Sequence, residues 1–274
     1  MGGYEEPLKG AVRKISDNIV TVSTPFTILG FVHLGARMAL FKYGDNVIIW
    51  SAIPYGPVFE EALELLSDGE PVNIAYVIVP NTAHYLCAHE YKLKYPHVKI
   101  IAPEFTNLKE NVQVDYKVDS SIGSRIIGKE ILQANLNIDD DYLLDNFNFV
   151  YMPKHTFNEL VVYEKNSKTL FAADLIIDSG KPNLEQYCAK TGYSDGHCPH
   201  TGFSYFARYL SVDNFIGRLI MKLLVNKSFT LDRQALISIN FLPFERIVPS
   251  HGNIIDTNAK EIYQDVFQIE QQNI

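Results

Sequence analysis

Cysteine is scarce in this sequence. The 274 residues include three cysteines, Cys87, Cys188 and Cys198, an odd number that is too small for the disulfide framework of a secreted domain. Such sparse use suits a reducing compartment, and the opening segment lacks the basic-then-apolar pattern of a secretory signal. Glu6 stands where N-myristoylation requires Ser or Thr. We therefore expect a cytoplasmic protein.

Positive charge and long apolar runs are also lacking. Lys and Arg number 24 against 32 Asp and Glu, a formal net charge of −8, so no overall positive field attracts phosphate backbones or anionic lipid. No apolar run reaches the ~18 residues of a membrane-spanning helix. No Gly-x-Ser-x-Gly elbow, Walker loop or dinucleotide glycine fingerprint is present. These absences argue against nucleic-acid and membrane partners, serine hydrolases, kinases and Rossmann dehydrogenases, and a small-molecule substrate remains the expected partner.

The composition that is present is that of an ordinary globular protein, with 47% apolar, 20% charged and 12% aromatic residues. No linker rich in Pro, Gly or Ser divides the chain. We therefore expect a single domain over residues 1–274, with a variable loop and helical insert at about 178–240.

The order of elements indicates an α/β (α+β) fold. Two hairpins of similar form, at 39–50 and 160–172, each combine an apolar strand, a polar turn and a second apolar strand. Between them, a strand at 75–79, a helix at 83–95 and a strand at 98–102 form a βαβ unit. Further strands are expected at 19–22, 112–118, 147–152 and 246–249, and further helices at 57–66, 213–224, 231–239 and 259–269. Two mixed sheets packed face to face with helices outside, a four-layer αββα sandwich, would bury a core suited to this length.

Three apolar strands are each followed by a residue that can bind a metal ion. His155 ends the segment Tyr-Met-Pro-Lys-His, Asp174 ends Phe-Ala-Ala-Asp, and His251 ends Val-Pro-Ser-His. Strand exits at one edge of a layered sheet converge on a common cleft. A fourth residue, His84, is expected at the start of the helix at 83–95, where a helix N-terminus favours the neutral imidazole that binds metal. Three histidines and one carboxylate suffice for a single Zn²⁺ or Fe²⁺ with an open position.

Several segments, in order, resemble the metallo-β-lactamase-like hydrolases and, within them, a branch of unassigned function. The segments are Val20-Thr-Val-Ser-Thr-Pro-Phe, Val79-Pro-Asn-Thr-Ala-His-Tyr, Tyr95-Pro-His-Val-Lys-Ile-Ile-Ala-Pro-Glu, Asn158-Glu-Leu-Val-Val-Tyr, Ala173-Asp-Leu and Ile247-Val-Pro-Ser-His-Gly. The resemblance runs from about residue 18 to about residue 267. It implies an αββα sandwich with a mono- or binuclear metal site. In that site His155 would be a ligand, Asp174 the carboxylate that bridges two metals in relatives, and His251 the late ligand.

The sequence departs from this family at two places. The family's first βα turn carries His-x-His-x-Asp-His, whereas the stretch at 81–86 reads Asn-Thr-Ala-His-Tyr-Leu, with His84 as its single, displaced histidine. The acidic residue usual after the second hairpin strand is Ser51, which removes a partner that would orient ligands. These departures argue against the usual two-metal site and predict a reduced, mononuclear one. His84 is inferred as its ligand from local position.

Each site residue also has a purely structural interpretation. His155 and His251 can be strand-end histidines bonded to backbone, Asp174 can cap a turn, and His84 can be a helix-start residue. Glu90 is either a partner of the site or a solvated charge.

Two other segments invite further interpretations. One follows Asp174 and is either a lid loop or a zinc site, although its spacing matches no standard zinc knuckle. Its candidate ligands are Cys188, His197, Cys198 and His200. The other is the apolar stripe of the helix at 213–224, which carries Arg218 and Lys222 and is either core, a homodimer face or a membrane-docking face.

Two functions fit these features. The first is a metal-dependent hydrolase of a small ester, lactone or amide-like bond, with Asp174 and His251 as catalytic residues and His84, His155, Asp174 and His251 as metal ligands. One Zn or Fe ion would polarise the carbonyl and lower the pKa of a bound water. The second is a hydrolase scaffold that has lost its full site, holds no ion, and binds a ligand or a partner. The metal content of the purified protein discriminates between the two.

Overall fold

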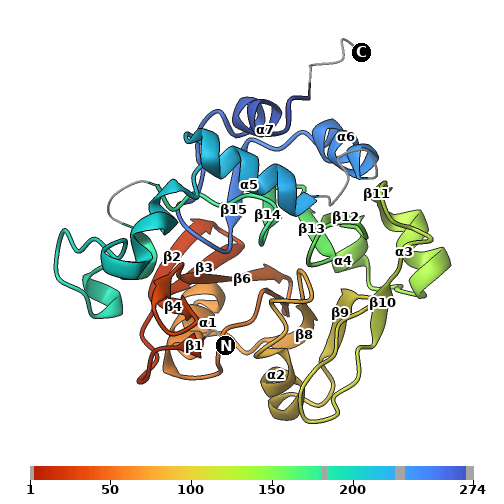
Figure 1. The fold of residues 1–274 in the computed structure, drawn as a ribbon. Coiled ribbons are helices and arrows are strands. Elements are labelled where there is room, and N and C mark those ends of the chain that lie inside the picture. The colour runs from red at the N-terminus through yellow and green to blue at the C-terminus, as the bar shows by residue number, and fades with distance from the viewer. Residues whose placement is uncertain (1–2, 181–183, 226–231, 270–274) are drawn as a thin grey trace.

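The computed structural model describes residues 3–180, 184–225 and 232–269, which form two mixed sheets with helices on both outer sides (Figure 1). The larger sheet has seven strands in the order β10-β9-β8-β7-β6-β3-β2. They are β2 (Ala11–Ser16), β3 (Ile19–Thr24), β6 (Ala36–Tyr43), β7 (Asn46–Trp50), β8 (Asn73–Ile78), β9 (Lys99–Pro103) and β10 (Tyr116–Val118). The predicted hairpin β6–β7 lies at the centre of this sheet, and Gly44 at its turn has a left-handed φ of 57° that suits glycine.

Parallel strands continue the sheet on one side of the hairpin. β7 pairs with β8, β8 with β9, and β9 with β10, all in parallel. Helix α1 (Pro57–Ser67) connects the first pair and α2 (Ala88–Lys94) the second, so the predicted βαβ unit is confirmed. Proline suits the start of α1, because the N–H groups of a first turn have no partner within the helix and proline lacks this group. Asp68 ends the helix in the left-handed conformation.

The smaller sheet has five strands in the order β11-β12-β13-β14-β15. They are β11 (Ile126–Ile127), β12 (Phe147–Met152), β13 (Glu159–Glu164), β14 (Thr169–Ala172) and β15 (Arg246–Pro249). The second predicted hairpin, β13–β14, lies inside this sheet, and β15 joins β14 in parallel. Both hairpins therefore occupy interior positions, as their similar patterns predict.

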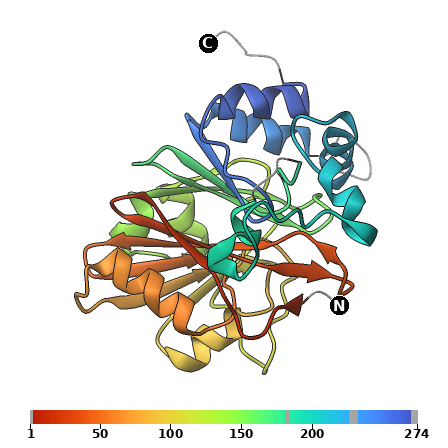
Figure 2. The ribbon, with the colours of Figure 1, turned by 90° about the vertical axis from the view of Figure 1, so that its left-hand side faces the viewer.

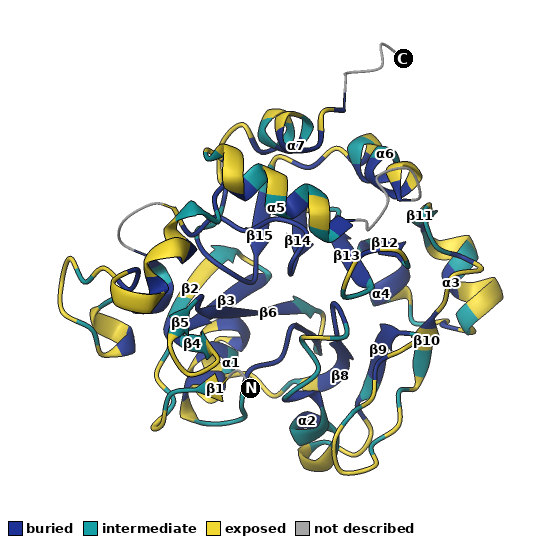
Figure 3. Cartoon of the chain, in the orientation of Figure 1, coloured by how far each residue is buried: buried dark blue, intermediate teal, exposed yellow. Residues whose placement is uncertain are grey.

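Three clusters of buried side chains correspond to the three interfaces of a four-layer structure, whose layers are visible in Figure 2. Along β6, Ala39 and Phe41 face the smaller sheet, while Met38 and Leu40 face α1 and α2, because side chains alternate across a strand. The outer face of the smaller sheet is covered by α5 (Phe215–Val225), α6 (Arg233–Phe241) and α7 (Ala259–Phe267). Figure 3 shows the interior strands of both sheets as buried, whereas the edge strands β2, β10 and β11 are partly exposed. The predicted αββα architecture is confirmed.

Several short elements carry no clear periodic signal and are additions to the prediction. A three-stranded sheet contains β1 (Gly3–Tyr4), β4 (Phe26–Ile28) and β5 (Val32–His33). Helices α3 (Lys129–Leu136) and α4 (Asp141–Leu144) precede β12. Between β14 and α5, the described chain forms three 3₁₀ helices, η1 (Glu185–Tyr187), η2 (Ala189–Thr191) and η3 (Gly202–Tyr209). Within the described ranges, no helix combines the length and apolar character that a membrane span requires.

Most predicted boundaries agree with the structure to within three residues, and two starts differ by more. The helix expected at 83–95 begins at Ala88, because Asn81 bends the preceding residues into a turn through its side chain. The strand expected at 112–118 is shorter and begins at Tyr116. The helix expected at 231–239 begins at Arg233 in the structure, and residue 231 lies outside the described residues.

The interface between the sheets provides a stability prediction. Phe171 is fully buried, and its ring centroid lies 4.8 Å from that of Phe41 and 5.5 Å from that of Trp50. We expect Phe171→Ala to lower the free energy of unfolding in urea by about 3–5 kcal/mol, because the lost ring leaves a cavity. Phe105→Ala is the control, since Phe105 is 63% exposed, and it should change stability by less than ~0.5 kcal/mol. Equal effects of the two substitutions would contradict the layered core.

Candidate metal centre

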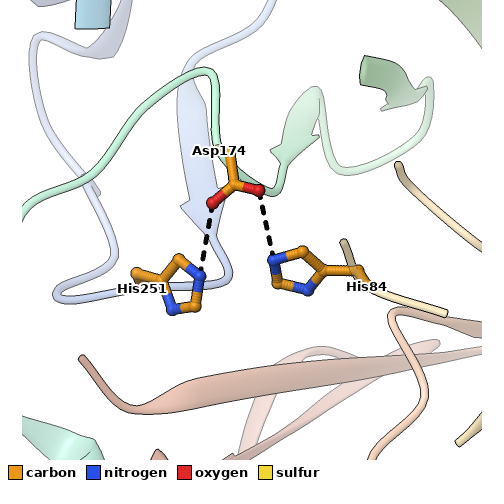
Figure 4. Close-up of side chains that lie close together, drawn as sticks. All are labelled: His84, Asp174 and His251. Carbon is orange, nitrogen blue, oxygen red and sulfur yellow. Dashed lines mark ion pairs between the residues drawn. The ribbon is translucent and has the colours of Figure 1, made fainter. Parts of the chain in front are cut away.

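Three of the four predicted ligands lie together at the carboxyl ends of strands from both sheets (Figure 4). Asp174 and His251 each follow their strand by two residues. Since β14 and β15 pair in parallel with Ala172 opposite Pro249, both residues lie at the same edge of the sheet. His84 comes from the loop between β8 and α2. Nε2 of His84 lies 3.4 Å from Oδ2 of Asp174, and Nε2 of His251 lies 3.3 Å from Oδ1. One potential ligand atom from each of the three residues lies within 4.8 Å of the other two.

The tautomer of His251 follows from its hydrogen bond to the backbone. Its Nδ1 lies 2.7 Å from the carbonyl oxygen of Gly35, and because a carbonyl only accepts, Nδ1 carries the hydrogen and donates it. Nε2 of neutral His251 therefore presents a lone pair to the carboxylate of Asp174. Two lone pairs at 3.3 Å repel each other, so this arrangement requires a cation. Either the two groups share a proton or a metal ion lies between them, and a backbone-bonded Nδ1 is typical of metal-ligating histidines.

His84 is oriented by a serine pair. Its Nδ1 lies 3.2 Å from Oγ of Ser51, which in turn lies 3.2 Å from Oγ of Ser250. Ser51 has a left-handed φ of 54°, an uncommon conformation for a residue other than glycine. Although the family's acidic residue is missing here, the serine hydroxyl still contacts His84. The hydroxyl forms a neutral hydrogen bond with the imidazole, whereas a carboxylate at this position would form a charged one.

Asn81 is a functional candidate that the sequence interpretation passed over. Its Nδ2 donates to Oε2 of Glu159 and to Oδ2 of Asp174, both at 2.7 Å. Its Oδ1 accepts from the backbone N–H of Ala83 at 2.8 Å and of His84 at 3.0 Å. All four hydrogen-bonding positions of this buried amide are therefore used. The signal in the sequence was its position, since Asn81 stands where the family's histidine cluster begins.

Glu159 is a second residue that the sequence interpretation missed. It is fully buried at the start of β13, and its Oε1 accepts from the backbone N–H of Ala173 at 2.5 Å and of Asp174 at 3.2 Å. Burial and the charge of Asp174 raise the pKa of Glu159 to about 8, although Asn81 and the two backbone donors oppose this shift. For Asp174 itself, burial acts to raise the pKa, but His84 and His251 outweigh it and hold the pKa well below the ordinary value. Asp174 is therefore the ionised carboxylate of the pair.

The structure places His155 outside this three-residue group. Its Nδ1 accepts the backbone N–H of Phe157 at 3.3 Å, so in the neutral ring Nε2 carries the hydrogen. This Nε2 is buried and has no hydrogen-bond partner in the described part of the chain. Burial lowers the pKa of His155 to about 4, although Asp174 acts in the opposite direction. His155 is thus a neutral donor beside the site, whereas an Nε2 ligand would need the other tautomer.

Two supporting inferences from the sequence need correction. His84 lies four residues before α2, which begins at Ala88, so no helix N-terminus sets its protonation state. Glu90 accepts the backbone N–H of Tyr55 at 2.8 Å, and its role there is to hold the loop after β7.

The candidate zinc ligands of the loop after Asp174 do not gather with the three-residue group. Across the described ranges, the closely spaced set of three or more potential ligands comprises His84, Asp174 and His251. The residues that lie outside it are Cys188, His197, Cys198 and His200. The thiols of Cys188 and Cys198 are free, and His200 is buried, which lowers its pKa. Among the described residues, these four side chains therefore form no closely spaced set of metal ligands.

The four hydrogen bonds of Asn81 predict a large effect of its removal. We expect Asn81→Ala to lower the free energy of unfolding by about 2–4 kcal/mol, since each buried group left without a partner costs ~1–3 kcal/mol. Asn73→Ala is the matched control, because its side-chain amide bonds Asn46 at an exposed position, and it should change stability by less than ~0.5 kcal/mol. Urea unfolding of both variants measures the difference. A neutral effect of Asn81→Ala would show that the network is not formed in solution.

The protonation of His155 predicts a pH dependence of stability. Its pKa is about 4 in the folded chain against an ordinary value of 6.5, so below pH 6.5 the unfolded chain binds a proton that the folded chain does not. The free energy of unfolding is therefore unaffected by this residue above pH ~6.5, and it falls by up to about 3 kcal/mol as the pH drops to ~4. His155→Asn retains an acceptor for Phe157 and should flatten the curve of unfolding free energy against pH in this window. Identical curves for the variant and the wild type would contradict the buried neutral imidazole.

The sequence matches no protein-family model and no curated protein, but the structure resembles solved metallo-β-lactamases over nearly its whole length. DIM-1 metallo-β-lactamase exposed to ceftazidime has a TM-score of 0.53 and 16% identity, with 96% of this chain and 99% of that chain covered. The mono-zinc form of FIM-1 metallo-β-lactamase from Pseudomonas aeruginosa has a TM-score of 0.53 and 12% identity, with 96% of each chain covered. A metallo-β-lactamase from Pontibacter korlensis has a TM-score of 0.53 and 14% identity, with 96% and 100% covered. At these identities the likeness concerns architecture, and the chain has the metallo-β-lactamase fold that its sequence motifs predict.

Proposed function

We propose that this chain is a metal-dependent hydrolase of a small ester, lactone or amide-like substrate. A single Zn or Fe ion would be held by His84, Asp174 and His251. One observation at His251 carries the proposal. Its Nδ1–H donates to the carbonyl oxygen of Gly35, and the lone pair on its Nε2 faces the carboxylate of Asp174. A cation is needed at that point. The metallo-β-lactamase fold, whose structural relatives include a mono-zinc form of FIM-1, supports a metal ion over a proton.

The three residues lie close enough to share one ion. One potential ligand atom from each lies within 4.8 Å of the other two. Asp174 approaches His84 through Oδ2 at 3.4 Å and His251 through Oδ1 at 3.3 Å, close to the ~3.4 Å between neighbouring ligand atoms of a tetrahedral shell with bonds of about 2.1 Å. Two imidazoles and one carboxylate form a donor set that Zn²⁺ and Fe²⁺ both accept, with a position left for water or substrate.

The surrounding residues divide the chemical tasks. A bound ion would polarise the scissile carbonyl and lower the pKa of a water molecule. Asp174, whose pKa is held well below its ordinary value, would be an ionised acceptor for that water, while His251 is held in place by its hydrogen bond to Gly35. The side chains of His84, Asp174 and His251 are only 13%, 9% and 6% exposed, which favours a small substrate.

A scaffold that has lost its metal and binds a ligand or a partner is the second candidate. The observation in its favour is that Asn81 bonds Glu159 and Asp174, and that a proton between His251 and Asp174 would complete this buried network. Such a network would stabilise the fold without catalysing a reaction.

Metal content and hydrolysis of the His251→Asn variant test the proposal. The asparagine amide can still donate to Gly35 but removes the Nε2 ligand, so we expect about one equivalent of Zn or Fe in the wild type and little in the variant. Activity on p-nitrophenyl acetate and on a panel of simple lactones should fall by at least about a hundredfold. His97→Asn, at an exposed position, is the matched control and should match the wild type in both measurements. Two results together would overturn the proposal and favour the scaffold. The wild type would take up neither Zn nor Fe from an excess of either metal, and His251→Asn would lower the free energy of unfolding in the absence of metal.

A further inference from the structure

Helix α5 presents its apolar residues to solvent. Phe215, Ile216, Leu219 and Leu223 are 79%, 48%, 42% and 51% exposed. At 100° per residue they form one stripe along the helix. The opposite side, with Gly217, Met221 and Val225, packs on the smaller sheet and its helices. The apolar stripe expected over 213–224 is therefore outside the core.

The 3₁₀ helix η3, which precedes α5 in the chain, also exposes apolar side chains. Phe203 and Phe206 are 83% and 75% exposed, and they project from the same face because a 3₁₀ helix repeats every three residues. Phe31, on the β4–β5 hairpin, packs against Phe203 with ring centroids 5.5 Å apart. Figure 2 places the cyan and light-blue segment that contains η3 and α5 along one side of the molecule. We name the exposed apolar residues of this segment the α5–η3 surface, and they are Phe203, Phe206, Phe215, Ile216, Leu219 and Leu223.

The charge of this surface is opposite to that of the whole chain. The chain has a net charge of −8, yet the segment 202–225 contains Arg208, Arg218 and Lys222 and one acidic residue, Asp213. Arg218 and Lys222 lie one turn apart along one edge of the exposed stripe. Arg218 lies 3.9 Å from the carboxylate of Asp265 on α7. The basic residues therefore border an apolar face.

A cavity of about 190 Å³ opens at the carboxyl end of α5. Lys222 and Arg233 line it together with the apolar side chains of Val225, Leu236, Phe267 and Ile269. Within the described residues, no carboxylate lies within salt-bridge distance of Lys222 or Arg233. Burial and the neighbouring Arg218 lower the pKa of Lys222, a cost that a bound anion would offset. A cavity with two cations and apolar walls suits a phosphate group attached to an apolar chain.

We propose that the α5–η3 surface docks on an anionic phospholipid membrane. The helix would lie in the plane of the interface with its phenylalanines among the acyl chains and Arg208, Arg218 and Lys222 at the headgroups. The cavity of Lys222 and Arg233 would accept one phosphate headgroup. A second copy of this chain is the other obvious occupant, but a two-fold pairing would bring this surface, with its excess of basic residues, against an identical surface. Charge complementarity therefore favours the lipid surface.

Vesicle binding of the full chain tests this proposal. We expect co-sedimentation with vesicles of equimolar phosphatidylcholine and phosphatidylglycerol, weak binding to phosphatidylcholine alone, and loss of binding at high salt. The triple variant Phe203→Ser, Phe206→Ser, Phe215→Ser should bind at least about tenfold more weakly, since burying even one large apolar side chain is worth roughly that factor. The double variant Lys222→Gln, Arg233→Gln should lower binding to the anionic vesicles towards the level seen with phosphatidylcholine.

A matched control separates this surface from general stickiness. Leu93→Ser, Phe105→Ser removes apolar residues that are 60% and 63% exposed on α2 and after β9, and it should bind vesicles as the wild type does. Equal loss in both serine variants would overturn the proposal. A second result would also overturn it. If the wild type does not bind vesicles, sediments as a dimer in sedimentation velocity, and becomes a monomer in the triple variant, the occupant is a second copy. None of these measurements depends on metal or hydrolysis, so their outcome is independent of the proposed function.

Discussion

The buried carboxylate of Asp174 is the constraint on which the candidate site depends. An ionised carboxylate away from water is costly unless donors or cations surround it. Here His84 and His251 approach its two oxygens and Asn81 donates to one of them. The parallel register of β14 and β15 places Asp174 and His251 at the same sheet edge. The fold therefore brings the charge and its partners together through backbone pairing, before any side chain is considered.

Asn81 links the two sheets at this point. Its amide spans from the loop after β8 to the start of β13 and the end of β14, where it contacts Glu159 and Asp174. Its carbonyl oxygen meanwhile shapes the turn that carries His84. An asparagine can do this because it offers two donors and two acceptor positions at one end of a short side chain. Where the metallo-β-lactamase-like family has a histidine cluster, this chain has a connector that positions one histidine.

Two carboxylates share this network, and their different surroundings separate their protonation. Glu159 faces one amide and two backbone donors inside the protein, and burial dominates its pKa. Asp174 faces two imidazoles, which dominate instead. A pair of neighbouring carboxylates of which one stays ionised is an arrangement often used at catalytic sites, and it also occurs in structural networks. The occupant of the space between Asp174 and the histidines decides between these roles.

Much of the architecture followed from local patterns in the sequence. Alternating and continuous apolar runs identified the strands of both hairpins, and Asp174 and His251, which follow β14 and β15, lie close together at one sheet edge. The tertiary structure decided the rest. Which nitrogen of His155 carries its hydrogen depends on a backbone N–H two residues away, and the role of Asn81 depends on groups 78 and 93 positions along the chain. The stripe of α5 likewise has the same periodicity whether it faces the core or the solvent. Periodicity reports that a helix has an apolar side, but only packing against the rest of the chain determines where that side points.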